Sequence, residues 1–277
     1  MKYALCITSP DVERDFMFSM MSGSLEKKLA DMAALGYSGI ELLCGQPELC
    51  DYKRVLQACK SNSLEISDLS SGALYTVTGL KLLVSDKEKR IEAAKVFTAA
   101  LDLAIKLGTD IITLGAFRGW ARDVGTIADG EEILADLFLS LEPRLLDNNI
   151  RIAIEAVSGG ETDIFNTCAQ VVSFIKRNNL KNTGVLFDSY HADIADDNPL
   201  KTLEDLIDSS MLLHFHISDS ERKIPGEGKI DFTALMRILI GKGYEGFLSG
   251  EIKSGENKLA TGMAVIHNMK EFERCIQ

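Results

Sequence analysis

Short apolar runs alternate with longer amphipathic segments from one end of the chain to the other. The short runs are rich in Val, Ile and Leu, which is typical of strands that are buried on both faces. They predict strands over residues 2–8, 39–43, 64–70, 110–116, 151–157, 183–189, 211–218 and 246–252.

The segments between these runs have apolar positions spaced as in helices. The helix predicted over 25–36 follows Ser24, a favourable cap, and ends at Gly36, while the long helix predicted over 86–108 ends at Gly108. The other predicted helices cover residues 51–62, 129–149, 165–179, 200–210, 231–243 and 259–275. Eight strand–helix pairs in 277 residues predict an α/β fold, a (β/α)8 TIM barrel, as one domain over residues 1–277.

A doubly wound open sheet is the competing architecture. It is disfavoured because no G-x-G-x-x-G pattern follows the first predicted strand. No linker rich in Pro, Gly or Ser divides the chain, and we expect longer loops near residues 70–86 and 116–129.

Composition narrows the class of protein. The chain is 46% hydrophobic and 26% charged and has a net charge of −11, which is unlike a nucleic-acid binder with a basic face. No apolar run reaches the roughly 18 residues of a transmembrane helix, and the first residues lack the pattern of a signal peptide. Six scattered cysteines without C-x-x-C spacing are typical of reduced thiols. We therefore expect a cytoplasmic protein with no structural zinc, no nucleic-acid partner and no membrane association.

Polar residues close several predicted strands, which is where a (β/α)8 barrel carries its chemistry. Glu155, Asp188, His216 and Glu251 are separated by 33, 28 and 35 residues, close to the roughly 30 residues of one βαβ unit. Taken singly, each is a solvated strand end or a helix cap. Four in register should converge on the barrel axis, where a divalent cation would relieve the repulsion between three carboxylates. Three carboxylates and one imidazole suit Mn²⁺, with Mg²⁺ or Co²⁺ as alternatives.

Further candidates lie close to these four residues. His214 shares a strand face with His216 but lies deeper, so we assign the ligand role to His216. His214 is then a substrate or supporting group, or a satisfied core histidine. Glu41 either faces the same pocket or pairs with a basic neighbour. Trp120, the only tryptophan, either stacks on a substrate or packs a loop.

Several stretches resemble the xylose isomerase-like TIM barrel superfamily, namely "IAIEAV", "GVLFDSYHAD", "HFHISDSERKIPGEGKIDF" and "GFLSGEI". They look most like the ketose 3-epimerases of the D-tagatose/D-psicose (allulose) type and their sugar-phosphate relatives. The resemblance follows the strand order of the whole chain. It is most specific where H-x-H is followed by an arginine and then by P-G-x-G-x-I-D-F. It implies metal ligation by Glu155, Asp188, His216 and Glu251, and substrate contacts from Glu161, His191 and Arg222.

The resemblance also implies a reaction, C3 epimerisation of a ketose or ketose phosphate through an enediolate intermediate. Glu155 and Glu251 would alternate as base and acid on opposite faces of the substrate, and Arg222 would hydrogen-bond the O2 oxygen. Without the resemblance, Arg222 would be an exposed loop charge. If the substrate carries a phosphate, Arg118 and Arg122 are candidates to bind it.

Other functions remain open at this point. An aldose–ketose or hydroxypyruvate-type isomerase would use the same metal site, as would a dehydratase, and a non-catalytic sugar-binding barrel is the non-enzyme alternative. An enzyme like endonuclease IV is disfavoured by the four histidines and the negative net charge. Family members are often homodimers or homotetramers, so the resemblance implies a homo-oligomer.

Overall fold

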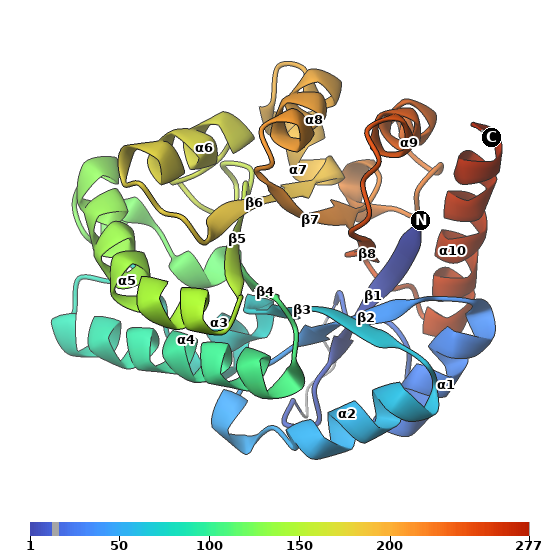
Figure 1. Ribbon diagram of the computed structural model, residues 1–277, viewed down its shortest axis with the longest axis horizontal. Coiled ribbons are helices and arrows are strands. Elements are labelled where there is room, and N and C mark those ends of the chain that lie inside the picture. Colours follow the sequence, from blue (N-terminus) through green and yellow to red (C-terminus); the bar gives the residue numbers. More distant parts are fainter. Residues whose placement is uncertain (13–16, 277) are drawn as a thin grey trace.

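Eight parallel strands, hydrogen-bonded in sequence order, form the centre of the protein. The computed structural model describes residues 1–12 and 17–276. β8 pairs with β1, so the sheet closes into a barrel (Figure 1). This confirms the predicted (β/α)8 fold. The strands are β1 (Lys2–Thr8), β2 (Gly39–Leu43), β3 (Glu65–Ser70), β4 (Ile111–Leu114), β5 (Arg151–Glu155), β6 (Thr183–Asp188), β7 (Leu212–Ile217) and β8 (Phe247–Gly250).

Helices surround the barrel on the outside (Figure 1). Eight of them match the predicted helices to within a few residues. These are α1 (Leu25–Leu35), α2 (Tyr52–Ser61), α4 (Lys87–Leu107), α5 (Ile127–Asp147), α6 (Cys168–Arg177), α8 (Pro199–Asp208), α9 (Phe232–Gly241) and α10 (Lys258–Arg274). In the part of the chain that the structure describes, none of the helices has the length and apolar character needed to cross a membrane.

Short helical elements fill the loops that follow the strands. The structure adds α3 (Gly72–Thr78) and α7 (Ser189–Ala195), which the sequence did not predict. Four 3₁₀ turns accompany them, η1 (Pro47–Leu49), η2 (Ala116–Arg118), η3 (Ala121–Asp123) and η4 (Ser220–Arg222). Both loops that were expected to be long therefore contain helical turns, α3 in the first and η2 and η3 in the second.

The residues that were predicted to begin and end helices form ordinary capping contacts. The Ser24 side chain accepts a hydrogen bond from the Lys27 N–H, and Gly36 ends α1 with a left-handed φ of 89°. Asp86 caps α4 by accepting from two backbone N–H groups, and Gly108 ends that helix with a φ of 72°. These ends fix the lengths of the connections and hence the register of successive strands.

Polar side chains are concentrated inside the barrel. Glu41 on β2 contacts His216 on β7, and these strands are not paired with each other, so the two side chains meet in the barrel interior. The large apolar core instead includes residues from the strands and from the surrounding helices. The barrel interior therefore contains buried charged and ligating groups, Glu41 and His216 among them.

Candidate active site

Four side chains from consecutive strands meet at the carboxyl end of the barrel. Glu155 and Asp188 are the last residues of β5 and β6, His216 is the fifth residue of β7, and Glu251 follows the last residue of β8. Asp188 and His216 are direct partners in the sheet register. One ligand atom from each of the four residues lies within 4.8 Å of the others. The structure thus brings together the four residues that the sequence singled out as metal ligands.

The arrangement of these atoms fits a cation. His216 Nδ1 lies 3.6 Å from Glu155 Oε1, 3.7 Å from Asp188 Oδ2 and 3.5 Å from Glu251 Oε2. These separations exceed those of ordinary hydrogen bonds. His216 Nδ1 and Glu155 Oε1 are both buried and have no hydrogen-bond partner among the residues that the structure describes, which is costly unless another group satisfies them. Three carboxylates and one imidazole form a donor set suited to a divalent cation.

The two glutamates of this cluster differ in their tendency to ionise. Burial raises the pKa of Glu251 above its ordinary value, although the nearby charges of Arg222 and His216 act in the opposite direction. Burial also disfavours ionisation of Glu155, but the neighbouring His216 and His191 hold its pKa below the ordinary value. The pKa values of these two neighbouring carboxyl groups are therefore displaced in opposite directions in the metal-free protein.

Arg222 reaches into the cluster from η4. Its Nη1 donates to Asp188 Oδ2 at 2.7 Å and also to Glu251 Oε2. The guanidinium carbon lies 4.8 Å from the ring centroid of Tyr190 and 5.1 Å from that of Phe18. Burial opposes ionisation of Asp188, yet the charge of Arg222 outweighs it and holds the pKa of Asp188 well below its ordinary value.

Asp219 determines the shape of the loop that carries Arg222, a role that the sequence did not reveal. Its side chain is completely buried, and its two oxygens accept hydrogen bonds from the backbone N–H groups of Ser220, Gly226, Gly228 and Ile230. The chain turns sharply here, because Arg222 itself has a left-handed φ of 61°. The only sequence signal was an aspartate placed shortly before two closely spaced glycines.

His191 stands at the start of α7 beside the cluster. Asp188 caps this helix, since its Oδ1 accepts from the N–H groups of Tyr190 and His191. The Ser158 N–H donates to His191 Nδ1 at 3.2 Å, and the other ring nitrogen, Nε2, faces Arg222. That nitrogen lies 2.7 Å from Arg222 Nη2 and 3.9 Å from Glu155 Oε1.

A cavity of about 370 Å³ opens above the four converging side chains. Its polar lining includes Glu155, Glu161, His191, His216, Arg222 and Glu251. Its apolar lining includes Met17, Phe18, Leu43, Tyr75 and Val157. Three of the predicted substrate contacts, Glu161, His191 and Arg222, therefore face one space together with three of the four predicted metal ligands, Glu155, His216 and Glu251.

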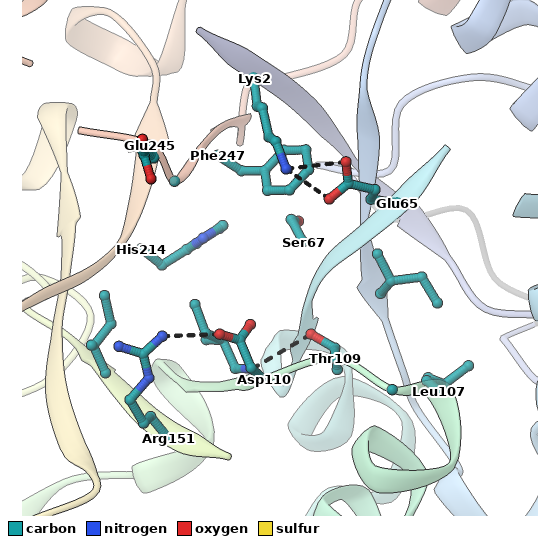
Figure 2. A pocket seen from close by; sticks show the side chains of 15 residues that line it. Lys2, Glu65, Ser67, Leu107, Thr109, Asp110, Arg151, His214, Glu245 and Phe247 are labelled. Carbon is teal, nitrogen blue, oxygen red and sulfur yellow. Dashed lines mark hydrogen bonds and ion pairs between the residues drawn. The ribbon is translucent and has the colours of Figure 1, made fainter. Parts of the chain in front are cut away.

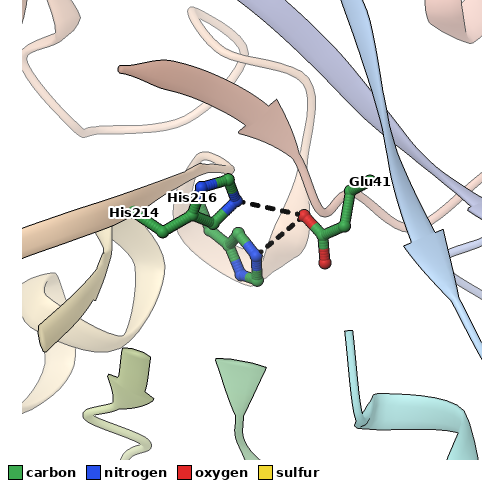
Figure 3. A group of neighbouring side chains, drawn as sticks. All are labelled: Glu41, His214 and His216. Carbon is green, nitrogen blue, oxygen red and sulfur yellow. Dashed lines mark hydrogen bonds and ion pairs between the residues drawn. The ribbon is translucent and has the colours of Figure 1, made fainter. Parts of the chain in front are cut away.

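The other predicted site residues do not line this cavity. Glu41 and His214 lie within the barrel below His216, and Glu41 Oε2 points at both imidazole rings (Figure 3). Trp120 lies beside η3, and the guanidinium carbon of Arg122 lies 3.8 Å from the centroid of its ring. Arg118 is fully buried and donates to four backbone carbonyls, those of Leu114, Gly115, Ile164 and Phe165. The Arg118 guanidinium is therefore engaged by backbone carbonyls and does not line the cavity.

A larger cavity of about 520 Å³ opens at the opposite, amino end of the barrel (Figure 2). Lys2 pairs there with Glu65 at 2.8 Å, and Arg151 pairs with Asp110 at 3.0 Å. His214 forms part of its inner wall. Because the cluster of four ligands faces the smaller cavity, and because barrel enzymes place their sites at the carboxyl ends of the strands, we take the smaller cavity as the candidate active site.

Several of the proteins that this chain resembles are named as sugar epimerases. The chain is 31% identical over 169 residues to 3-dehydro-D-guloside 4-epimerase of Escherichia coli, which covers 58% of this chain and 64% of that protein, just under two thirds of its length. It is 27% identical over 251 residues to L-ribulose 3-epimerase of Methylomonas sp., covering 88% of this chain and 84% of that protein.

Solved structures share the fold. The apo form of 3-keto-D-glucoside 4-epimerase from E. coli superposes with a TM-score of 0.80 at 20% identity, covering 98% of this chain and all of that one. The profile of the xylose isomerase-like TIM barrel family matches residues 29–269, the greater part of the chain. The chain therefore belongs to the xylose isomerase-like TIM barrel family.

Proposed function

We propose that this chain is a metal-dependent sugar epimerase that inverts C3 of a ketose through an enediolate intermediate. One observation carries the proposal, which is the convergence of three carboxylates and His216 from four consecutive strands. Within the described part of the chain, His216 Nδ1 and Glu155 Oε1 are buried there without a hydrogen-bond partner. Two relatives that are named as sugar epimerases support the same reaction class.

The metal would be held by Glu155, Asp188, His216 and Glu251. Mn²⁺ is the cation we propose, with Mg²⁺ and Co²⁺ as alternatives, because all four donors are oxygen or imidazole nitrogen. A divalent cation bound there supplies Lewis acidity, which stabilises the negative charge that develops on the substrate oxygens. Arg222, already directed at Asp188 and Glu251, adds positive charge beside the same oxygens.

Glu155 and Glu251 would perform the proton transfers. A C–H group beside a carbonyl is a weak acid, and epimerisation needs a proton removed from one face of the carbon and returned to the other. The two glutamates come from β5 and from the end of β8, and both line the cavity. Because they come from different strands, one carboxylate can accept a proton on one side of the substrate while the other carboxyl group donates one on the other side.

The remaining polar residues of the cavity would orient the sugar. His191, whose ring contacts both Ser158 and Arg222, lines the cavity and can hydrogen-bond a hydroxyl group of the sugar. Glu161 lies on the loop after β5 and can accept from hydroxyl groups. The apolar wall would contact the C–H faces of the sugar.

Incorporation of solvent deuterium tests the proposal directly. The protein with Mn²⁺ is incubated in D₂O with a panel of ketoses and ketose phosphates, and each sugar is followed by NMR. We expect deuterium at C3 together with a new epimer. Deuterium at C1 with formation of an aldose would instead support the isomerase alternative. No exchange with any sugar, with or without Mn²⁺, would contradict an enzymatic function and favour a sugar-binding barrel.

Gly115, directly after β4, leaves room for the carboxylate of Glu155. A Cβ atom at this position would lie 2.5 Å from Glu155 Oε2. Because this oxygen is at the end of a flexible side chain, the carboxylate can shift to make room. We expect Gly115→Ala to leave the free energy of unfolding almost unchanged while turnover falls by about a hundredfold, because the base is displaced. Turnover and urea unfolding of the same preparations measure the two effects.

Gly72 provides a matched control within the same cavity. A Cβ atom there would lie 3.6 Å from both Leu43 Cδ2 and Ser70 Oγ, which are ordinary contacts. We expect Gly72→Ala to retain turnover. Equal losses in the two variants would show that added bulk in the cavity, rather than displacement of Glu155, lowers the rate.

A further inference from the structure

Glu41 connects two histidines in the interior of the barrel (Figure 3). It is the middle residue of β2 and is completely buried. Its Oε2 lies 3.0 Å from His216 Nε2 and 3.4 Å from His214 Nε2. The proposed reaction does not use Glu41, and the cavity that would hold the substrate does not contact it. A buried carboxylate in this place therefore needs another explanation.

The two nitrogens of His216 face different groups. Nδ1 is turned toward the three carboxylates of the proposed metal site, and Nε2 is turned toward Glu41. Neutral imidazole has one N–H and one nitrogen lone pair, so it can bind a cation through Nδ1 only if the proton is on Nε2. A carboxylate that accepts from the Nε2–H group favours that tautomer and also fixes the plane of the ring.

We propose that Glu41 is a positioning residue that holds His216 as the Nε2–H tautomer, so that Nδ1 is presented to the metal ion. The inference rests on the metal dependence of the proposed function and assigns to Glu41 a part in cation binding, with no direct contact to metal or substrate. The Glu41 carboxylate accepts a hydrogen bond from the imidazole ring of His216 and influences the metal ion only through that ring.

Further buried groups hold Glu41 in place from below. His214 Nε2 lies between Glu41 Oε2 and Asp68 Oδ1, at 3.4 Å and 3.3 Å. Asp68 Oδ1 also accepts from the Ser67 hydroxyl at 2.6 Å. The rings of His214 and His216 are almost perpendicular, at 85°, with centroids 5.3 Å apart. The contacts thus run from β3 through His214 to Glu41 and reach the metal site only through His216.

The same atoms admit a competing interpretation, a second cation between Glu41, His214 and His216, since one ligand atom from each lies within 4.8 Å of the others. His216 would then have to bind one cation through each ring nitrogen, which requires loss of both ring protons. The 3.0 Å contact between His216 Nε2 and Glu41 is already an ordinary hydrogen bond. The positioning role needs no such deprotonation.

Titration of the metal-stripped protein with MnCl₂ by calorimetry tests the proposal. We expect the native chain to bind one Mn²⁺ and Glu41→Gln to bind it about 10- to 100-fold more weakly, because glutamine holds no charge to favour the Nε2–H tautomer. Asp68→Asn is the matched control, since Asp68 is equally buried and contacts His214. We expect it to have a much smaller effect.

The outcomes separate this proposal from the proposed function. A native protein that binds no Mn²⁺ contradicts the metal-dependent function itself. Native binding with unchanged affinity in Glu41→Gln, equal losses in both variants, or two Mn²⁺ ions per chain would each overturn the role of Glu41. Should Glu41→Gln fail to fold, ¹⁵N NMR of histidine in the native protein loaded with diamagnetic Mg²⁺ decides. An Nε2–H proton on His216 supports the proposal, and its absence overturns it.

Discussion

Glu155→Gln and Glu251→Gln are each expected to lower the rate of epimerisation by about a hundred- to ten-thousandfold. An amide cannot accept a proton, and positioned acid–base groups contribute a factor of this size. Both side chains line the cavity and converge on His216 Nδ1. Epimer formation is measured by NMR under saturating sugar and Mn²⁺, with the bound Mn²⁺ determined in each variant, because glutamine also weakens a metal ligand.

The two variants should also differ from each other. If each glutamate serves one face of the carbon, each variant retains the base for one epimer only. Deuterium from D₂O would then enter one epimer in Glu155→Gln and the other in Glu251→Gln, with little interconversion in either. Glu65→Gln, in the cavity at the other end of the barrel, is the control that should keep the native rate. A glutamine at 155 or 251 with near-native epimerisation would rule out catalysis by two bases.

The regular elements of the fold could be predicted from sequence because they repeat a simple pattern. Apolar runs specified the strands, and the helix ends at Gly36 and Gly108 occurred at the predicted glycines. α3 and α7 were missed because each has only seven residues, too few to establish a helical period. α7 begins where Asp188 caps it, and the sequence interpretation had considered that residue mainly as a ligand.

Within the site, the spacing of polar residues in the sequence predicted which of them lie at strand ends. It did not predict how deep in the barrel each side chain lies. Glu155 ends β5, whereas Glu41 is the middle residue of β2 and pairs in register with Cys6 and Asp68. Glu41 therefore lies below His216. The position of Arg222 depends on its left-handed backbone and on the contacts of Asp219 with the following loop, neither of which follows from local periodicity. The cytoplasmic location and the homo-oligomer stay predictions.

Removal of the metal is expected to destabilise the fold and to stop exchange at C3. Without a cation, the buried carboxylates of Glu155 and Asp188 and the partly exposed carboxylate of Glu251 remain close to one another, beside Arg222 and His216. A ligand present at about 100 times its Kd adds about 2.7 kcal/mol to the free energy of unfolding, which for a domain of this size corresponds to about 5 °C in Tm. Calorimetric scans with Mn²⁺, with EDTA, and after Mn²⁺ is restored measure the shift.

Asp188→Asn separates this effect from a general loss of structure. Asparagine is as good a helix cap as aspartate, so the hydrogen bonds that Asp188 Oδ1 accepts from the N–H groups of Tyr190 and His191 should persist in the variant. The anionic ligand, however, is lost. We expect its Tm to be nearly the same in Mn²⁺ and in EDTA, because the cation no longer binds tightly. An EDTA-insensitive Tm in the native protein, or an equal Mn²⁺ shift in Asp188→Asn, would argue against a cation held by this cluster.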